Sequence, residues 1–225
     1  MIFAIIVAAG KSDRMGSNVD KAFLSLGTQP VLAYCLQAFE KCPEIDGIVL
    51  VVRKDRLEPA RGLVQIFGCS KVAKVVVGGA SRQASVLNGL AVLSDDVKFV
   101  SIHDGARPCV TTALISETIK AAKRYGSGVA AMKVTDTVKE VKHGITVART
   151  VDRSMLWAVQ TPQTFRRDLL EKGYATARKK GLSMTDDASA VELVSKEVRL
   201  VPSTWSNVKV TVPEDLAIVA ALLKV

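Results

Sequence analysis

The 225-residue sequence predicts an α/β fold, in which a mostly parallel, twisted sheet lies between two layers of helices. Strand-sized apolar runs alternate with stretches of helical periodicity over residues 2–134. The most polar, glycine-bearing loops follow the first, third and fourth of these strands. Because ligands in such folds bind beyond the carboxyl ends of the strands, we expect these loops to form one composite site.

Local signals support each element of this first part. Pro30 suits the start of a helix, Gly78-Gly79 closes a strand, and Ser81 is a good N-cap. The expected elements, in chain order, are a strand at 2–8, a helix at 31–41, a strand at 45–52, a helix at 55–67, a strand at 72–77, a helix from 81, a strand at 98–102, a helix at 112–124 and a strand at 128–134.

The pattern changes after residue 134. Residues 137–151 alternate around Lys142-His143-Gly144, which is typical of a β-hairpin. Because an isolated hairpin is marginally stable, we expect it to pack on something else, such as another subunit. Helices at 166–180 and 186–196, strands at 197–201 and near 207–211, and a helix starting at Pro213 complete the chain. With no linker or repeat, we expect a single domain, 1–225, with an inserted and protruding β-arm at about 137–153.

Composition excludes several classes of protein. With 48% hydrophobic and 24% charged residues, the chain can bury a sizeable core. Its apolar runs are too short to span a membrane, and the first run reaches Gly10-Lys11 too soon for a secretory signal. The four cysteines form no metal or disulfide pattern, so we expect a cytoplasmic protein with reduced thiols.

The net charge of +9 indicates an anionic partner. Aromatic residues make up 5% of the chain and do not alternate with basic ones, which disfavours a platform for single-stranded nucleic acid. A phosphorylated small molecule is therefore the favoured partner, and we expect neither nucleic acid nor a membrane.

The first polar loop runs from Gly10 to Gly16 and is followed by Lys21. Its spacing matches neither a Walker loop nor Gly-x-Gly-x-x-Gly. Arg14 and Lys21 could neutralise a triphosphate and the charge that develops during phosphoryl transfer. The alternative is a pair of solvated surface cations.

Two further loops carry candidate ligands. The loop at 78–85 offers a helix N-terminus to an anion or a base, although taken alone it favours an ordinary capped turn. In His103-Asp104-Gly105-Ala106-Arg107-Pro108, Asp104 could hold Mg²⁺ against phosphate oxygens, or it could simply pair with Arg107. His103 is better explained as a satisfied core histidine.

Two cations flank the arm and the end of the chain. Arg153 could form a bidentate pair with a phosphate, and Lys209 either snorkels from an edge or reaches into the site. Structural salt bridges would explain both equally well. Serine-nucleophile catalysis is not supported, because Gly-x-Ser-x-Gly is absent from the sequence.

Several of these blocks occur together in one order. They are Val7-Ala8-Ala9-Gly10 with Arg14 and Lys21, Gly78-Gly79 with Arg82 and Ser85, His103 to Pro108, Thr150-Val151-Asp152-Arg153, Thr161-Pro162-Gln163, Thr185-Asp186-Asp187-Ala188 and Lys209-Val210-Thr211. From about residue 2 to 223 the chain resembles the 2-C-methyl-D-erythritol 4-phosphate cytidylyltransferases of the non-mevalonate isoprenoid pathway. The resemblance implies a Rossmann-like nucleotidyltransferase fold and a homodimer interlocked by the arm.

The resemblance also implies a reaction and its residues. CTP and methylerythritol phosphate would give a CDP-alcohol and pyrophosphate with Mg²⁺, by direct in-line attack of the acceptor phosphate on the α-phosphate. Arg14 and Lys21 would stabilise the transition state, and Arg153 and Lys209 would position the acceptor phosphate. The nucleotide would contact Ala8, Ala9, Gly10, Gly79, Arg82, Ser85 and Asp104, of which Asp104 would also hold the metal. The acceptor would be surrounded by Arg107, Thr137, Thr161 and Thr185.

Four positions depart from the usual pattern of that family: Ser12, Asp20, Ala22 and Gly105. Asp20 places a negative charge beside the proposed catalytic Lys21. The alternatives to methylerythritol phosphate are ribitol 5-phosphate as the acceptor and a sugar 1-phosphate with another nucleotide. From other classes, a non-catalytic nucleotide-binding regulator would be expected to lack Lys21, Arg14 or Asp104, and a nucleic-acid-binding protein would show salt-dependent duplex binding.

Overall fold

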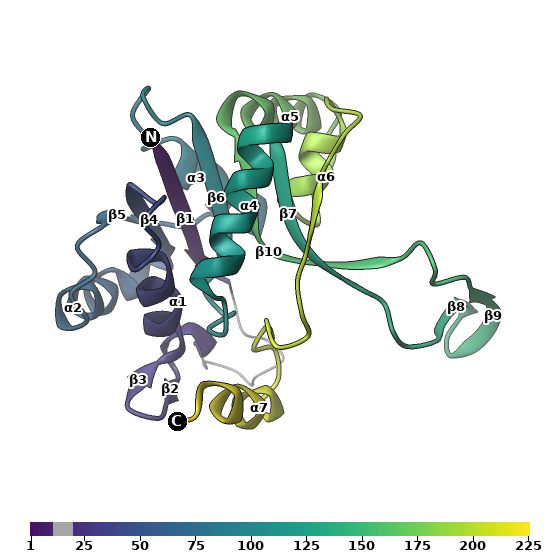
Figure 1. Ribbon diagram of the computed structural model, residues 1–225, viewed down its shortest axis with the longest axis horizontal. Coiled ribbons are helices and arrows are strands. Elements are labelled where there is room, and N and C mark those ends of the chain that lie inside the picture. The colour runs from purple at the N-terminus through teal and green to yellow at the C-terminus, as the bar shows by residue number, and fades with distance from the viewer. Residues whose placement is uncertain (11–19) are drawn as a thin grey trace.

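The computed structural model describes residues 1–10 and 20–225, and seven strands of these residues form one central sheet (Figure 1). The strand order is β11-β7-β10-β6-β1-β4-β5. The strands are β1 (Ile2–Ala8), β4 (Gly47–Val52), β5 (Val72–Val77), β6 (Phe99–Asp104), β7 (Ser127–Lys133), β10 (Trp157–Arg166) and β11 (Leu200–Pro202). The predicted α/β class with a mostly parallel sheet is confirmed.

Strand β10 runs antiparallel to both of its neighbours, β6 and β7, whereas the other pairings in this described sheet are parallel. The sequence did not predict this strand. Pro162 interrupts it, and its pairing with β7 shifts register between Val159 and Gln163. Proline within a run argues against a central strand, and the register shift is where this sheet accommodates it.

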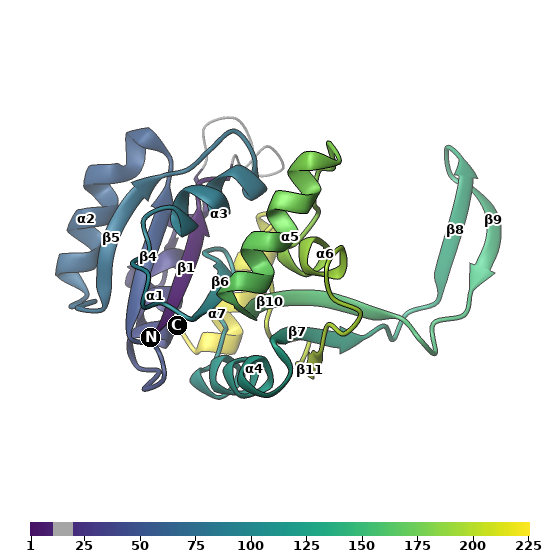
Figure 2. The ribbon, with the colours of Figure 1, turned by 90° about the horizontal axis from the view of Figure 1, so that it is seen from above.

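Helices cover both faces of the sheet (Figure 2). They are α1 (Val31–Glu40), α2 (Leu57–Ile66), α3 (Arg82–Leu90), α4 (Thr112–Tyr125), α5 (Arg167–Lys179), α6 (Asp187–Glu192) and α7 (Glu214–Leu223). Side chains alternate along β1, so that Ala4 and Ile6 join one core with α1, α2 and α4, while Ile5 joins the other with α3, α5 and α6. Among the described residues no helix is long and apolar enough to cross a membrane.

Two predictions for the last part of the chain are wrong. The helix expected at 186–196 ends at Glu192, and 207–211 is not a strand. The alternation at 207–211 has another cause: Val210 is buried in a third apolar cluster with Leu26, Val31 and Val219, and its N–H donates to the carbonyl of Ala106 at 2.8 Å. This segment crosses the carboxyl edge of the sheet and carries Lys209 there.

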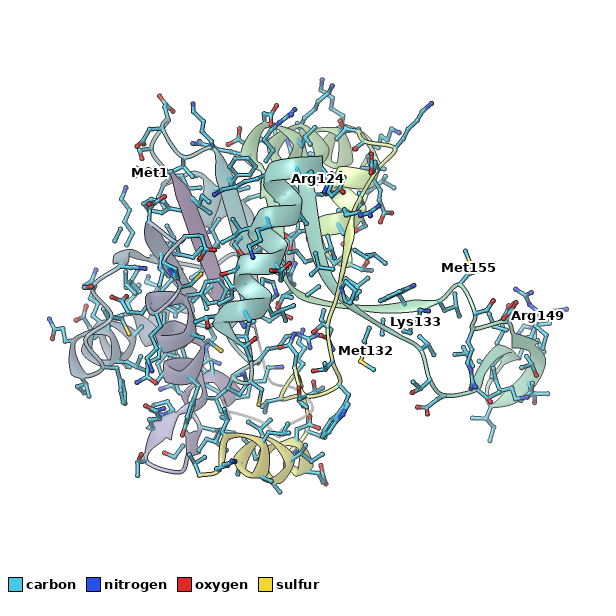
Figure 3. The ribbon with its side chains drawn as sticks, in the orientation of Figure 1. Met1, Arg124, Met132, Lys133, Arg149 and Met155 are labelled. Atoms are coloured by element: carbon cyan, nitrogen blue, oxygen red, sulfur yellow. The ribbon has the colours of Figure 1, made fainter. Side chains whose placement is uncertain are left out.

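The expected arm is present. Strands β8 (Val138–His143) and β9 (Thr146–Val151) pair with each other outside the central sheet and project far from the body (Figures 1 and 2). Arg149 lies on the arm, and Met155, which is 85% exposed, points into solvent where the chain returns to β10 (Figure 3). Two short 3₁₀ helices, η2 (Lys21–Phe23) and η3 (Lys54–Arg56), and the small hairpin β2 (Ser25–Leu26) and β3 (Gln29–Pro30) complete the described elements.

Candidate functional site

A cavity of about 720 Å³, called here the first cavity, opens at the carboxyl ends of β1, β5 and β6. Most of the predicted nucleotide and catalytic residues line it: Ala9, Gly10, Lys21, Gly79, Arg82, Ser85, Asp104 and Lys209. Ala8 is buried beneath it between two lining residues. Arg14 lies outside the described residues. The described parts of the loops that follow the first, third and fourth predicted strands therefore meet as expected.

The loop from Gly78 to Ser81 packs tightly against the end of β1. A Cβ on Gly78 would lie 2.3 Å from the Cβ of Ala9, so only glycine fits there. Ser81 caps α3 by accepting from the N–H of Ala84 at 3.0 Å, and the hydroxyl of Ser85 accepts from the N–H of Gly79 at 3.1 Å. The predicted N-cap is thus confirmed, and it holds a helix N-terminus at the cavity wall, where an anion is stabilised.

Asp104 lies at the centre of the site and pairs with cations from three segments. Its Oδ1 accepts from Nε of Arg82 at 3.1 Å, and its Oδ2 accepts from Nζ of Lys209 at 2.7 Å. Arg107 places its Nε 3.9 Å from Oδ2. Burial opposes ionisation of Asp104, but these cations, Arg82 first, hold its pKa well below the usual range of a carboxyl group. Asp104 is therefore a carboxylate at any physiological pH.

Arg82 also pairs with a second carboxylate, that of Asp187 on α6. This fully buried carboxylate accepts from Nη2 of Arg82 at 2.8 Å and from the hydroxyl of Tyr174. Burial acts to lower the pKa of Arg82, but Asp187 and Asp104 raise it well above its usual value. Burial and Asp187 also raise the pKa of Tyr174. Arg82 is thus fixed between two carboxylates, and the sequence pattern assigned no such role to Asp187.

A second cavity of about 460 Å³ adjoins the first. Three of the predicted acceptor residues, Arg107, Thr161 and Thr185, line it. The two cavities share a wall formed by Arg82, Asp104 and Lys209, called here the shared wall. A group bound in one cavity can therefore face a group bound in the other across one carboxylate and two cations.

His103 is a satisfied core histidine, as expected. Its Nε2 lies 3.2 Å from the carbonyl of Arg107 and its Nδ1 3.1 Å from the Thr161 hydroxyl, which also accepts from the N–H of Asp104 at 3.0 Å. Burial lowers the pKa of His103 to about 3. The imidazole is therefore neutral, with its Nε2–H donating to the Arg107 carbonyl and its Nδ1 accepting from Thr161. This chain of hydrogen bonds fixes the backbone that presents Asp104.

Arg53 and Lys54, which the sequence pattern did not single out, also line the first cavity. They directly follow β4, so their position at the carboxyl edge could have been inferred from the same strand-end rule. Unlike the other three loops at this edge, the loop after β4 contains no glycine to mark it.

The remaining predicted residues, Thr137 and Arg153, lie on the arm. Nη1 of Arg153 donates to Oγ1 of Thr137 at 3.5 Å, so the structure brings these two together. Within the described part of a single chain, neither lines either of the two cavities.

Asp104 is the carboxylate that the shared wall offers to a metal ion. The described residues contain no group of three or more His, Cys, Asp or Glu side chains that could hold an ion by themselves. Mg²⁺ usually takes one or two carboxylates and completes its shell with phosphate oxygens and water. The ionised Asp104, in the wall between two cavities, fits that requirement for a metal that arrives with a nucleotide.

A doubly covered α/β sheet with two joined cavities at its carboxyl edge, one rich in cations and main-chain donors, is the architecture of a nucleotidyltransferase. Comparisons with known proteins specify the family. The model of the 2-C-methyl-D-erythritol 4-phosphate cytidylyltransferase family matches residues 2–225, and this chain belongs to that family.

Individual relatives agree over nearly the full length. The enzymes of that name from Dehalococcoides mccartyi and Desulforamulus reducens are 46% and 44% identical to the chain, over 98% and 99% of it and 95% and 96% of their own lengths. The crystal structure of 4-diphosphocytidyl-2C-methyl-D-erythritol synthase from Anaerococcus prevotii is similar, with a TM-score of 0.87 and 30% identity over 100% of this chain and 96% of that one.

Proposed function

We propose that the protein transfers CMP from CTP to 2-C-methyl-D-erythritol 4-phosphate, forming 4-diphosphocytidyl-2-C-methyl-D-erythritol and pyrophosphate. The observation that carries the proposal is the shared wall of Arg82, Asp104 and Lys209 between two cavities. One phosphate oxygen of the acceptor attacks the α-phosphorus, and the bond to the bridging oxygen of pyrophosphate breaks. Because the acceptor is itself the nucleophile, the protein has to position two anions and stabilise the added charge.

The first cavity is suited to the nucleotide. Its main-chain N–H groups at the start of α3 and the side chains of Lys21, Arg53 and Lys54 favour a triphosphate. Lys21 is assigned to the charge that develops on the α-phosphate, and the family resemblance adds Arg14 to this role. Asp104 would hold Mg²⁺ against the phosphate oxygens, where the ion supplies further charge neutralisation.

The second cavity is suited to the acceptor. Arg107 and Thr185 line it, and Lys209 contributes to it from the shared wall. Arg107 has a structural task as well, since its Nη1 donates to the carbonyl of Asn207 at 2.7 Å and so holds the segment that carries Lys209.

Arg153 and Thr137 belong to the same acceptor site only if another chain supplies them. The arm extends away from its own body, and Ile145 at its turn is 97% exposed (Figure 2). We therefore assign the arm to a homodimer in which each arm reaches the second cavity of the partner. Isologous exchange of identical arms would satisfy both copies at once.

A pyrophosphate-release assay tests the reaction. With CTP and Mg²⁺ we expect release only when an acceptor is added, and we expect it to be fast with methylerythritol phosphate and slow with ribitol 5-phosphate or sugar 1-phosphates. Faster turnover with ribitol 5-phosphate would reassign the acceptor, and release with none of the panel would refute the enzymatic function.

A further inference from the structure

Asp20 directly precedes Lys21, yet only 3% of its side chain is exposed. Charged side chains are seldom buried unless they are paired, because removal from water disfavours the ionised form. The acidic residue at this edge of the site therefore needs a structural explanation.

One carboxylate oxygen of Asp20 organises the short helix that contains Lys21. Oδ1 accepts from the N–H of Ala22 at 3.3 Å and caps η2, while the main-chain carbonyl of Asp20 accepts from the N–H of Phe23 at 2.9 Å. A three-residue 3₁₀ helix has too few hydrogen bonds to fix its own position. The orientation of Lys21 thus depends on contacts made outside η2, which include the core packing of Ala22 and Phe23 and the contacts of Asp20.

The other oxygen of Asp20 faces two arginines of the segment that follows β4. Oδ2 lies 3.3 Å from Nε of Arg56 and 3.8 Å from Nη2 of Arg53. Among the described residues it makes no hydrogen bond, so charge alone holds it there. The guanidinium of Arg56 also lies 5.5 Å from the ring centre of Phe23, which ties the far end of η2 to the same side chain.

The contact of Asp20 with Arg53 and Arg56 joins two parts of the wall of the first cavity, because Lys21 and Arg53 both line that cavity. Burial raises the pKa of Asp20, while Arg53, the Ala22 N–H and Arg56 act to lower it. The ionised form of Asp20 consequently depends on the two arginines, and in return Asp20 offsets two positive charges close to Lys21.

We propose that Asp20 is a positioning residue for Lys21, anchoring η2 to Arg53 and Arg56 so that the ammonium group of Lys21 faces the nucleotide. This inference rests on the proposed function, in which Lys21 acts on the transition state. The role is specific to the ionised side chain, since an amide could still cap η2 but could not pair with the two arginines.

A double-mutant cycle tests the proposal. We expect Asp20→Asn to lower kcat about tenfold or more and to change the KM for CTP less than about twofold, because the lost interaction acts in the transition state. In the Lys21→Ala background the same substitution should have no further effect on kcat. The proposal would be overturned if Asp20→Asn lowered kcat by the same factor in the wild type and in Lys21→Ala, or if it did not lower kcat in the wild type.

Asp55→Asn is the matched control. Asp55 accepts from Nε and Nη2 of the same Arg53, at 3.1 and 2.8 Å, and its Oδ2 lies 3.7 Å from Nε of Arg56. Its side chain is 62% exposed, however, and touches no part of η2 within the described contacts. We expect its kcat to stay within about twofold of the wild type. If Asp20→Asn does not fold, Arg56→Gln breaks the anchor from the other side and enters the same cycle.

A second measurement separates this proposal from the reaction itself. An amine-reactive ester modifies Lys21, and mass spectrometry measures the rate relative to that of Lys120 on α4. We expect this relative rate to change about threefold or more in Asp20→Asn and to stay unchanged in Asp55→Asn. An unchanged rate in Asp20→Asn would reject the positioning role. This outcome can be read even if the wild-type protein releases no pyrophosphate, in which case the proposed function fails on its own.

Discussion

Nζ of Lys209 lies 2.7 Å from Oδ2 of Asp104, although 105 residues separate them in the chain. Two hydrogen bonds hold the segment that carries Lys209. The N–H of Val210 donates to the carbonyl of Ala106, and Nη1 of Arg107 donates to the carbonyl of Asn207. The end of β6 and the loop that follows it therefore fix the position of Lys209 relative to Asp104. Both partners face two cavities, which makes this contact the junction between the two proposed substrates.

Replacement of Lys209 should impair use of the acceptor. We expect Lys209→Ala to lower kcat/KM for the acceptor by about 10²–10³-fold, as the loss of one preorganised charge at a developing anion does. The fold should persist, because Asp104 keeps Arg82 at 3.1 Å. Steady-state kinetics at saturating CTP measure the effect. Lys120→Ala removes an exposed cation paired with Glu117 and is the control; a similar loss there would mean that net charge, and not the shared wall, sets the rate.

Replacement of Asp187 should affect stability. Asp187→Asn leaves Arg82 with one carboxylate and removes a buried charge partner, which typically costs about 3–5 kcal/mol. Urea unfolding monitored by circular dichroism gives the free energy. Glu171→Gln breaks the exposed ion pair with Arg167, and we expect it to cost less than about 1 kcal/mol. Equal costs for the two variants would show that the buried pair contributes no more than a surface pair.

The proposed exchange of arms predicts complementation between inactive variants. Lys21→Ala and Arg153→Ala should each be nearly inactive, but random mixing should restore about a quarter of wild-type activity, because half of the dimers then contain one intact site. Lys21→Ala mixed with Lys209→Ala should restore nothing, since both positions line the same chain's cavity. Failure of the first mixture, with dimer exchange verified by native mass spectrometry, would remove Arg153 from the partner's site.

His103 predicts a stability loss in mild acid. Its pKa is about 3 in the folded chain against 6.5 for a free side chain, so the unfolded state takes up the proton first as the pH falls. Stability should therefore decrease between about pH 6.5 and about pH 3, at up to about 1.4 kcal/mol per pH unit. The difference in unfolding free energy between wild type and His103→Asn should shrink from about pH 7 to about pH 5. His143→Gln, which replaces an exposed histidine of the arm, is the control, and the same shrinkage there would mean that the effect is not specific to His103.

Much of the site could be predicted because strand ends are easy to locate in the sequence. The apolar run of β1 and the glycines after β5 define one edge of the sheet, and residues as distant as Gly10, Arg82 and Asp104 meet there. Strand β10 could not be predicted in the same way. Its proline and polar side chains are not typical of a buried strand, and it is buried because it lies between β6 and β7.

Which residues contact one another was harder to infer from the sequence than which edge of the sheet they occupy. The alternation around Val208 and Val210 looks like a strand, but it reflects packing of a crossing segment on α7. In the sequence, Asp20 places a negative charge beside Lys21, and nothing in the sequence shows that Arg53 and Arg56 lie opposite it. Such compensation depends on tertiary contacts between loops, which local patterns do not encode.

The arm leaves the sheet from β7 and returns on β10, and Lys133 at the end of the first strand pairs with Trp157 at the start of the second. Topologically, the arm is the long loop of a β-hairpin whose stem is already complete. Closing a longer loop adds little entropy cost, so the length of the arm is nearly neutral for folding of the body. Folding of the central sheet therefore places little constraint on the length of the arm, and the constraint comes instead from the proposed reach of Arg153 and Thr137 into the partner's second cavity.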